Sequence, residues 1–256
     1  MASSSLLNTR WSETARQENV WYSYPRPRLK RKRWQCLNGE WEYAITAKDS
    51  PEWPGADGKI RVPFAVEWSL SGVEKPLTPD NCLWYRRSFG VPAEWRSERV
   101  LLNFEAVDWS AEVWVNGKRV GEHQGGYDPF GFDISPFLKE GENELVIKVV
   151  DPTDQGDQPR GKQALSPEHI WYRATSGIWQ TVWLEPVPEV SVAAISTVAS
   201  VDGLLDLGVI VNADDELHGT NRWEVEVTIT RQGQTILQEV QPFIAELEDP
   251  WLGRAR

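Results

Sequence analysis

The sequence predicts an all-β fold, and three observations carry that prediction. Residues 111–115 alternate between two kinds of position, with Val113 and Val115 on one face of the expected strand. Asn116-Gly117 follows directly, and this dipeptide favours the two-residue turn of a β-hairpin. No helical period is sustained over twelve residues anywhere in the chain. Strands joined by turns are therefore the expected architecture.

The elements of a first unit follow in chain order after a polar segment, residues 1–33, in which Pro25 and Pro27 favour extended backbone. Each predicted strand shows alternation or a short apolar run bounded by turn residues. The predicted strands cover residues 37–43, 60–64, 83–91, 99–107, 111–115, 143–150 and 178–184. Residues 161–173 read as an irregular polar and aromatic segment.

A second unit begins where Pro186-Val187-Pro188 interrupts the chain. Strands are expected at residues 190–198, 204–211, 222–230 and 235–240. An immunoglobulin-like sandwich has about seven strands in about 100 residues, and only four or five fit between here and Arg256. The predicted organisation is an extended arm at 1–33, a jelly-roll β-sandwich at 34–187 and a partial, apparently truncated immunoglobulin-like β-sandwich at 188–256.

Charge limits the classes of partner. The formal net charge is −11, and from Trp34 onward 19 basic residues face 36 acidic ones. Such a body repels nucleic acid and anionic lipid, so neither is expected as a partner. Residues 26–33 hold six basic residues, and we expect them to form a solvated arm across the acidic body.

Cysteine use and hydropathy bear on location. Cys36 and Cys82 do not form a disulfide framework and are expected as reduced, packed thiols. Residues 1–10 lack the apolar region of a secretory signal, and no run of eighteen apolar residues occurs. A cytoplasmic location is the expectation.

Fifteen tryptophans are many for a chain of 256 residues. Most tryptophans of a β protein fill the core, and the others are candidates for faces on which pyranose rings lie. The abundance favours carbohydrate handling without locating it.

Several motifs, in order, resemble family 2 of the glycoside hydrolases, which includes β-galactosidases, β-glucuronidases and β-mannosidases. The resemblance covers about residues 20–187. The motifs are Tyr24-Pro25-Arg26-Pro27, Leu37-Asn38-Gly39-Glu40-Trp41, Val62-Pro63-Phe64, Trp84-Tyr85-Arg86-Arg87, the hairpin 113–121 with Glu122-His123-Gln124-Gly125-Gly126-Tyr127, and Ser176-Gly177-Ile178.

The resemblance implies a jelly-roll sugar-binding domain and an immunoglobulin-like domain that precede a (β/α)₈ catalytic barrel carrying two glutamates. Nothing here alternates strand with helix. The resemblance therefore implies the non-catalytic N-terminal region of a β-glycosidase acting on β-galactosides or β-glucuronides. Its expected partners are a carbohydrate and the barrel, and no cofactor is expected.

The resemblance also points to site residues. In several family members a jelly-roll loop reaches the active site, where an Asp touches the sugar five residues before the small residue that precedes Gly-Ile. Here that position is Trp171, so Glu168 and His169 are the candidate polar contacts, and Trp171 and Tyr172 a candidate stacking wall. Ordinary packing or solvation of these residues is the alternative.

No metal site is expected. Asp151, Asp154 and Asp157 are spaced like a cation loop but lack the following liganding glutamate, so a solvated turn is expected instead. Two other functions stay open: a self-standing lectin-like module, which titration with sugar would reveal, and a protein-interaction sandwich, which would bind a protein without sugar.

Overall fold

The computed structural model describes residues 9–15, 21–212 and 223–243. The chain divides into two compact units, with the boundary between Pro186 and Val187, and Arg26–Lys30 group with the second unit. Helical segments are short. Among the described residues they are α1 (Ser12–Ala15) and the 3-10 turns at Ser69–Ser71, Ala93–Trp95 and Ser135–Phe137. Within the described ranges no helix is long and apolar enough to cross a membrane.

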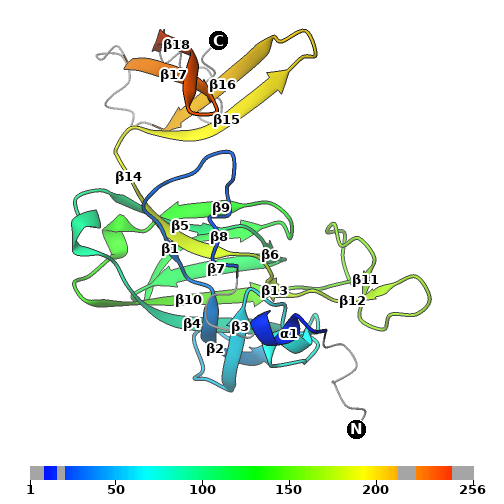
Figure 1. Ribbon diagram of the computed structural model, residues 1–256. Helices are drawn as coiled ribbons and strands as arrows, with labels where there is room; N and C mark the ends of the chain where they lie inside the picture. The colour runs from blue at the N-terminus through cyan, green and yellow to red at the C-terminus, as the bar shows by residue number, and fades with distance from the viewer. Residues whose placement is uncertain (1–8, 16–20, 213–222, 244–256) are drawn as a thin grey trace. The chain divides into compact units, whose positions relative to one another are not determined.

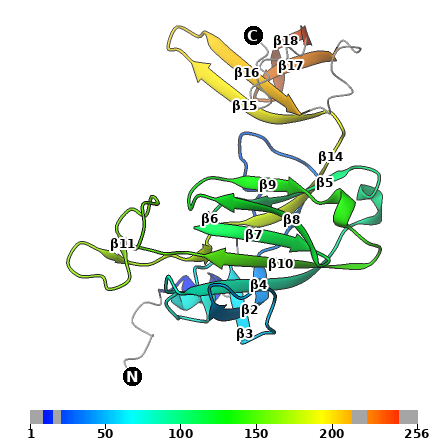
Figure 2. The same cartoon turned by 180° about the vertical axis from the view of Figure 1, so that it is seen from behind.

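The first unit is a β-sandwich of two main sheets (Figures 1 and 2). One has the order β1-β14-β5-β9 and the other β3-β2-β4-β10-β7-β8. A short pair, β6 (Val107–Asp108) with β13 (Gly177–Ile178), closes one end of the sandwich. The remaining strands are β1 (Gln35–Cys36), β2 (Gly39–Ala47), β3 (Gly58–Val62), β4 (Asn81–Gly90), β5 (Arg99–Phe104), β7 (Ser110–Val115), β8 (Lys118–Gln124), β9 (Phe130–Asp133), β10 (Glu142–Val150) and β14 (Val182–Val187).

The core lies between the two sheets and follows from the alternation in the sequence. On β10, Leu145, Ile147 and Val149 are completely buried, and from the opposite sheet Leu102 and Phe104 of β5 are buried as well. Burying one such side chain contributes about 1.5–3 kcal/mol relative to exposure. The all-β prediction and its sandwich are confirmed, and the completely buried apolar residues of these two strands alternate along the chain.

The predicted hairpin is present. Asn116 and Gly117 have φ values of 52° and 75°, as the two-residue turn between β7 and β8 requires. The Asn116 side chain fixes the turn further, because its Nδ2 donates to Phe137 O and to Asn143 Oδ1, both at 2.8 Å. Local turn chemistry and a long-range contact therefore specify the same register.

At Gly177 the backbone approaches the Tyr85 ring closely. Its φ is +87°, and a Cβ atom there would overlap the Tyr85 hydroxyl. That hydroxyl accepts a hydrogen bond from Ile178 N at 3.1 Å, and Tyr85 is completely buried. Only glycine satisfies both the backbone conformation and the approach of the ring.

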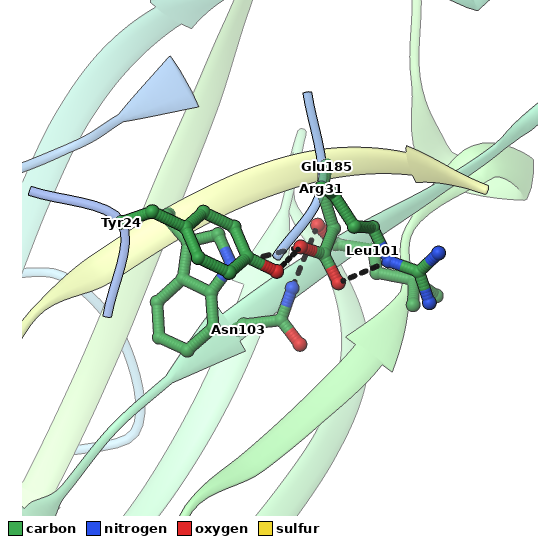
Figure 3. Close-up of polar contacts among 6 residues, drawn as sticks. Tyr24, Arg31, Leu101, Asn103 and Glu185 are labelled. Atoms are coloured by element: carbon green, nitrogen blue, oxygen red, sulfur yellow. Dashed lines mark hydrogen bonds and ion pairs between the residues drawn. The ribbon is translucent and has the colours of Figure 1, made fainter. Parts of the chain in front are cut away.

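A buried carboxylate ties the N-terminal segment to the first unit (Figure 3). Glu185 on β14 is fully buried, and its Oε2 accepts hydrogen bonds from Tyr24 Oη at 2.8 Å and Trp183 Nε1 at 3.2 Å. Arg31 Nε pairs with Oε1 at 3.2 Å. Below the carboxylate, Asn103 Nδ2 donates to Leu101 O at 3.4 Å. The partners of the Glu185 carboxylate, Tyr24, Trp183 and Arg31, offset the cost of burying it.

Two residues at the end of the basic segment pair with acidic groups of the sandwich. Arg31 binds Glu185, and Arg33 pairs with Glu98 at 2.5 Å. The Arg31 side chain is only 18% exposed, so this residue is packed rather than solvated. Both cysteines are unbridged in the structure, Cys36 half-buried and Cys82 buried.

The second unit contains two antiparallel hairpins in the range where the sequence predicts a partial immunoglobulin-like sandwich. Their strands are β15 (Ser191–Ala199), β16 (Leu205–Asn212), β17 (Trp223–Arg231) and β18 (Gln234–Phe243). The alternation predicted on β17 is present from residue 224 to 230, where every other side chain is exposed. The exact domain boundaries stay a prediction.

Gly177→Ala should lower the free energy of unfolding of the first unit by about 3 kcal/mol, because positive φ costs an L residue about 1–2 kcal/mol and overpacking adds about 1–3 kcal/mol. Gly72→Ala is the matched control, since Gly72 also has positive φ (+82°) but nothing lies within 4 Å of an added Cβ. The control should cost only about 1 kcal/mol. Equal urea midpoints for the two variants would contradict this account.

Candidate functional site

One long segment leaves the sandwich and returns to it. We call this segment, residues 151–175, the arm; it is not the N-terminal segment 1–33. The arm follows β10, ends just before β13, and projects from one end of the sandwich in both views (Figures 1 and 2). Two short strands pair within it in parallel, β11 (Gln163–Ala164) and β12 (Tyr172–Arg173). The segment 161–173, predicted to be irregular, therefore contains two residue pairs of a short parallel ladder, Gln163 with Tyr172 and Ala164 with Arg173.

Ser176 anchors the base of the arm. Its backbone N–H donates to Glu67 Oε2 at 2.9 Å, and its hydroxyl donates to Asp151 Oδ2 at 2.7 Å. Ser176 O also accepts a hydrogen bond from Val66 N at 3.3 Å. Ser176 is completely buried and the two carboxyl groups are 1% exposed. The two ends of the arm are thus held together by hydrogen bonds shielded from water.

The sequence interpretation of Asp151 as part of a solvated turn is wrong. Asp151 Oδ1 accepts a hydrogen bond from Thr153 N at 2.7 Å, which turns the chain as the arm begins. Asp154 Oδ2 accepts from Leu165 N at 3.1 Å, while Asp157 is exposed. These carboxyl groups do not converge, and no group of metal-ligating side chains occurs among the residues that the structure describes.

Gln163 fastens the middle of the arm to the sandwich. Its Nε2 donates to Asp108 Oδ2 at 2.9 Å, and its Oε1 accepts from Thr175 N at 2.6 Å. Asp108 belongs to β6 and is 3% exposed. Its carboxyl group lies against Gly126, where a Cβ would collide with it. Gly126, one of the two glycines of the motif that ends at Tyr127, therefore makes room for this carboxyl group.

The three buried carboxyl groups have shifted pKa values. Burial raises the pKa of Asp108 to about 7, the negative charges of Asp151 and Glu67 act in the same direction, and the hydrogen bond from Gln163 opposes the rise. Burial also raises the pKa of Glu67 and of Asp151, with hydrogen bonds from Ser176 acting against it in both cases. Glycoside hydrolysis needs two carboxyl groups that face the substrate. This buried cluster instead has the geometry of a structural anchor.

The residues predicted to contact sugar lie together at one turn of the arm. Glu168 and His169 are exposed, and the turn closes through a hydrogen bond from Trp171 N to Glu168 O at 3.0 Å. Trp171 is 43% exposed, Tyr172 66% and Ile170, which the sequence did not single out, 65%. We call residues 168–172 the arm tip.

Two cations accompany the aromatic rings of the arm tip. The Arg160 guanidinium lies 5.9 Å from the centre of the Trp171 ring, and Lys162 Nζ lies 6.0 Å from that of Tyr172. The Glu168 and His169 side chains form no hydrogen bond or ion pair with a described residue. The arm tip offers aromatic faces, a carboxylate and an imidazole, which together suit a polyhydroxylated ring.

The sequence identified the arm tip but not its base. Glu67 and Asp108 belong to no motif, and their burial arises from contacts far along the chain; Glu67 and Ser176, for example, are 109 residues apart. The usable signal was the Ser176-Gly177-Ile178 motif, which marks where the arm ends.

Comparison with known proteins assigns the family. The model of the sugar-binding domain of glycosyl hydrolases family 2 matches residues 34–188, more than half of the chain. The chain belongs to glycosyl hydrolase family 2. The resemblance seen in the sequence is confirmed, and the matched residues of this family 2 chain contain both main sheets, the arm and its anchor.

Curated relatives of the family 2 chain carry two enzyme names. A β-glucuronidase of Formosa agariphila is 33% identical over 134 residues, covering 52% of this chain and 13% of the relative. A β-galactosidase of Priestia megaterium is 26% identical over 245 residues, covering 80% of this chain and 22% of the relative. The chain thus spans about a fifth or less of the length of these relatives.

Solved structures agree on the fold. A Ruminococcus gnavus β-glucuronidase in complex with D-glucaro-d-lactam superposes with a TM-score of 0.65 at 20% identity, covering 86% of this family 2 chain and 39% of the other. A β-D-mannosidase of Dictyoglomus thermophilum gives a TM-score of 0.62 at 22% identity, with coverages of 82% and 29%.

Asp108 should make the stability of the first unit depend on pH. An unfolded Asp titrates near pH 3.9 and folded Asp108 at about 7, so between these values the folded state holds more protons and stability falls as pH rises. One group contributes a fall of at most about 1.4 kcal/mol per pH unit. Asp108→Asn should flatten this fall and be more stable than the wild type at pH 8.

Urea unfolding of both proteins between pH 4 and pH 8 checks the expectation. Asp157→Asn is the control, because it removes an exposed carboxylate from the same arm and should leave the profile unchanged. A wild-type profile parallel to that of Asp108→Asn would show that Asp108 does not titrate in this window.

Proposed function

We propose that this chain is the N-terminal sugar-binding region of a β-glycosidase and that the arm tip forms one wall of the pocket that holds the terminal sugar. The observation that carries the proposal is the contrast within the arm. Its base is fixed by buried hydrogen bonds to Ser176 and Asp108, whereas Trp171 and Tyr172 are exposed at its tip. Exposed aromatic rings on an anchored support are typical of a binding element.

Within this proposal the arm tip has two kinds of contact. Trp171 and Tyr172 stack on the apolar face of the sugar, and Glu168 and His169 exchange hydrogen bonds with its hydroxyl groups. Since Trp171 takes the place of the sugar-touching Asp of similar enzymes, the polar contact moves to the preceding residues of the same turn.

The chemical step belongs to a catalytic domain with which this region associates. The carboxyl groups that the first unit brings together are buried in structural hydrogen bonds. The names of the curated relatives support β-galactosides or β-glucuronides as substrates of the whole protein. The exposed apolar residues described below support a domain partner.

A lectin-like module is the second candidate, because the exposed arm tip would also serve free glycans. Titration of this chain alone with methyl β-D-galactoside and methyl β-D-glucuronide separates the two functions. Perturbation of Trp171 by either sugar in the absence of a catalytic domain would favour the module.

Trp171→Ala and Tyr172→Ala should each raise the KM of the whole enzyme about tenfold, because each removes a stacking face worth about 1.4 kcal/mol. Initial rates with p-nitrophenyl β-D-galactoside and β-D-glucuronide measure the effect. Tyr22→Ala is the control, since Tyr22 is 61% exposed and lies outside residues 151–175. An unchanged KM in both arm variants would overturn the assigned role.

The 256-residue chain by itself should self-associate. Apolar side chains of its second unit are exposed, among them Val198 (69%), Leu204 (70%) and Ile236 (62%), and such surface is normally covered. Analytical ultracentrifugation over a range of concentrations should show a rising average mass. A monodisperse monomer at high concentration would contradict the prediction.

A further inference from the structure

A second aromatic surface lies on the face of the six-stranded sheet that is turned away from the core. Antiparallel sheets that face water on one side usually carry polar residues there. Here Trp84 and Val146 are buried on that face, in a small cluster to which Trp53 and Trp114 add half-buried rings. Strands β4, β10 and β7, which form this surface, run side by side (Figure 2).

The strand register places these residues next to one another. Val146 on β10 lies opposite both Arg86 on β4 and Trp114 on β7. The rings of Trp84 and Trp114 have centroids 5.8 Å apart at an angle of 32°. Trp53 comes from the loop between β2 and β3, with the Arg86 guanidinium 5.9 Å from the centre of its ring.

Hydrogen bonds hold the loop of Trp53 in place. Lys148 Nζ donates to Ser50 O at 2.8 Å and lies 5.4 Å from the centre of the Trp84 ring. At the far end of the loop, Asp57 Oδ2 accepts from Ile45 N at 2.9 Å. The Trp53 ring is therefore presented by a loop tied to the sheet at both ends.

Between these rings lies a pocket of about 260 Å³, which we call the tryptophan groove. Trp84 and Val146 are its buried members, Trp53 and Trp114 are half-buried, and Gly117 of the hairpin turn adds no side chain that could fill it. The groove shares no residue with the arm. A pocket slightly smaller than those of drug-sized ligands suits one ring rather than a long ligand.

Polar groups at the groove are free to bind. The indole N–H groups of Trp53 and Trp114 have no hydrogen-bond partner among the described residues, and neither has the exposed Glu52 carboxylate. The neighbouring cations are engaged, because Arg86 pairs with Glu144 at 2.9 Å and Lys148 binds Ser50 O. The residues that line the groove thus include two N–H donors and one carboxylate without a partner among the described residues, beside apolar ring faces.

We propose that the tryptophan groove is a second carbohydrate-binding site, separate from the arm, that takes one neutral pyranose ring of a glycan. The sugar ring stacks on the half-buried indole rings of Trp53 and Trp114, its hydroxyl groups donate to Glu52, and its oxygen atoms accept from the indole N–H groups. The unpaired carboxylate and the net charge of −11 disfavour a uronate.

The test is a titration of the 256-residue chain followed by the ¹H–¹⁵N signals of the tryptophan side chains. Methyl β-D-galactoside should shift the Trp53 and Trp114 indole signals with a Kd in the millimolar range, as a ligand of this size allows. Methyl β-D-glucuronide should bind at least about fivefold more weakly. No shift at Trp53 and Trp114 with the neutral sugar overturns the proposal.

Variants separate this site from the arm. Trp53→Ala and Trp114→Ala should each raise the Kd for the galactoside at least about tenfold. The Kd is followed at the indole signal of the groove tryptophan that remains. Glu52→Gln changes an exposed side chain and should not affect folding. It should reduce the difference in affinity between the galactoside and the glucuronide. Equal affinities in the wild type and all three variants would overturn the proposal.

Two control variants show whether the sugar binds at the groove or at the arm. Trp68→Ala, a half-buried tryptophan outside both sites, should leave the groove shifts unchanged. Trp171→Ala should leave them unchanged as well, because the groove does not depend on the arm. Loss of the groove shifts in Trp171→Ala would assign the binding to the arm and overturn the second site.

Discussion

The arrangement of the first unit depends on the hydrogen bonds of one buried serine. Ser176 binds Glu67 through its backbone and Asp151 through its hydroxyl, and so joins the segment after β3, the end of β10 and the start of β13. Because all three groups are shielded from water, none can exchange its partner for solvent at low cost. The arm can therefore leave the sandwich for 25 residues without loosening the sheets beneath it. Gly177 adds to this constraint, because its lack of a side chain lets the Tyr85 hydroxyl approach the backbone directly after Ser176.

Local sequence signals predicted what depends on local structure. Asn116-Gly117 specified its hairpin because turn conformation is a property of those two residues. The alternation in β10 specified which side chains enter the core. Asp151 shows the limit of local signals, because its spacing with Asp154 and Asp157 does not predict that its side chain is buried. Its partner Ser176 lies 25 residues away, and only the folded chain brings the two together. The parallel pairing of β11 with β12 involves two residues in each strand, too few to produce a periodic pattern.

The same limit applies to the candidate site. Residues 168–172 are neighbours in sequence, so predicting them as a group required only the motif that follows them. Asp108 and Gln163, which fasten the arm, are 55 residues apart, and nothing in their spacing predicts that they meet. The abundance of tryptophan was informative about the whole chain but not about individual residues. Trp41 and Trp183 fill the interior, Trp171 is exposed on the arm, and Trp53 and Trp114 line the outer face of the larger sheet.

The carboxylate of Glu185 has a practical consequence for any shortened version of this protein. Two of its partners, the Tyr24 hydroxyl that donates a hydrogen bond and the Arg31 guanidinium that supplies the opposite charge, come from residues that precede the family match at 34–188. Cloning from the first matched residue would remove both while leaving the acid in the interior beside Trp183. An expression plasmid should therefore start before Tyr24, because sequence similarity marks an evolutionary unit whereas electrostatic neutralisation determines how much chain must be kept.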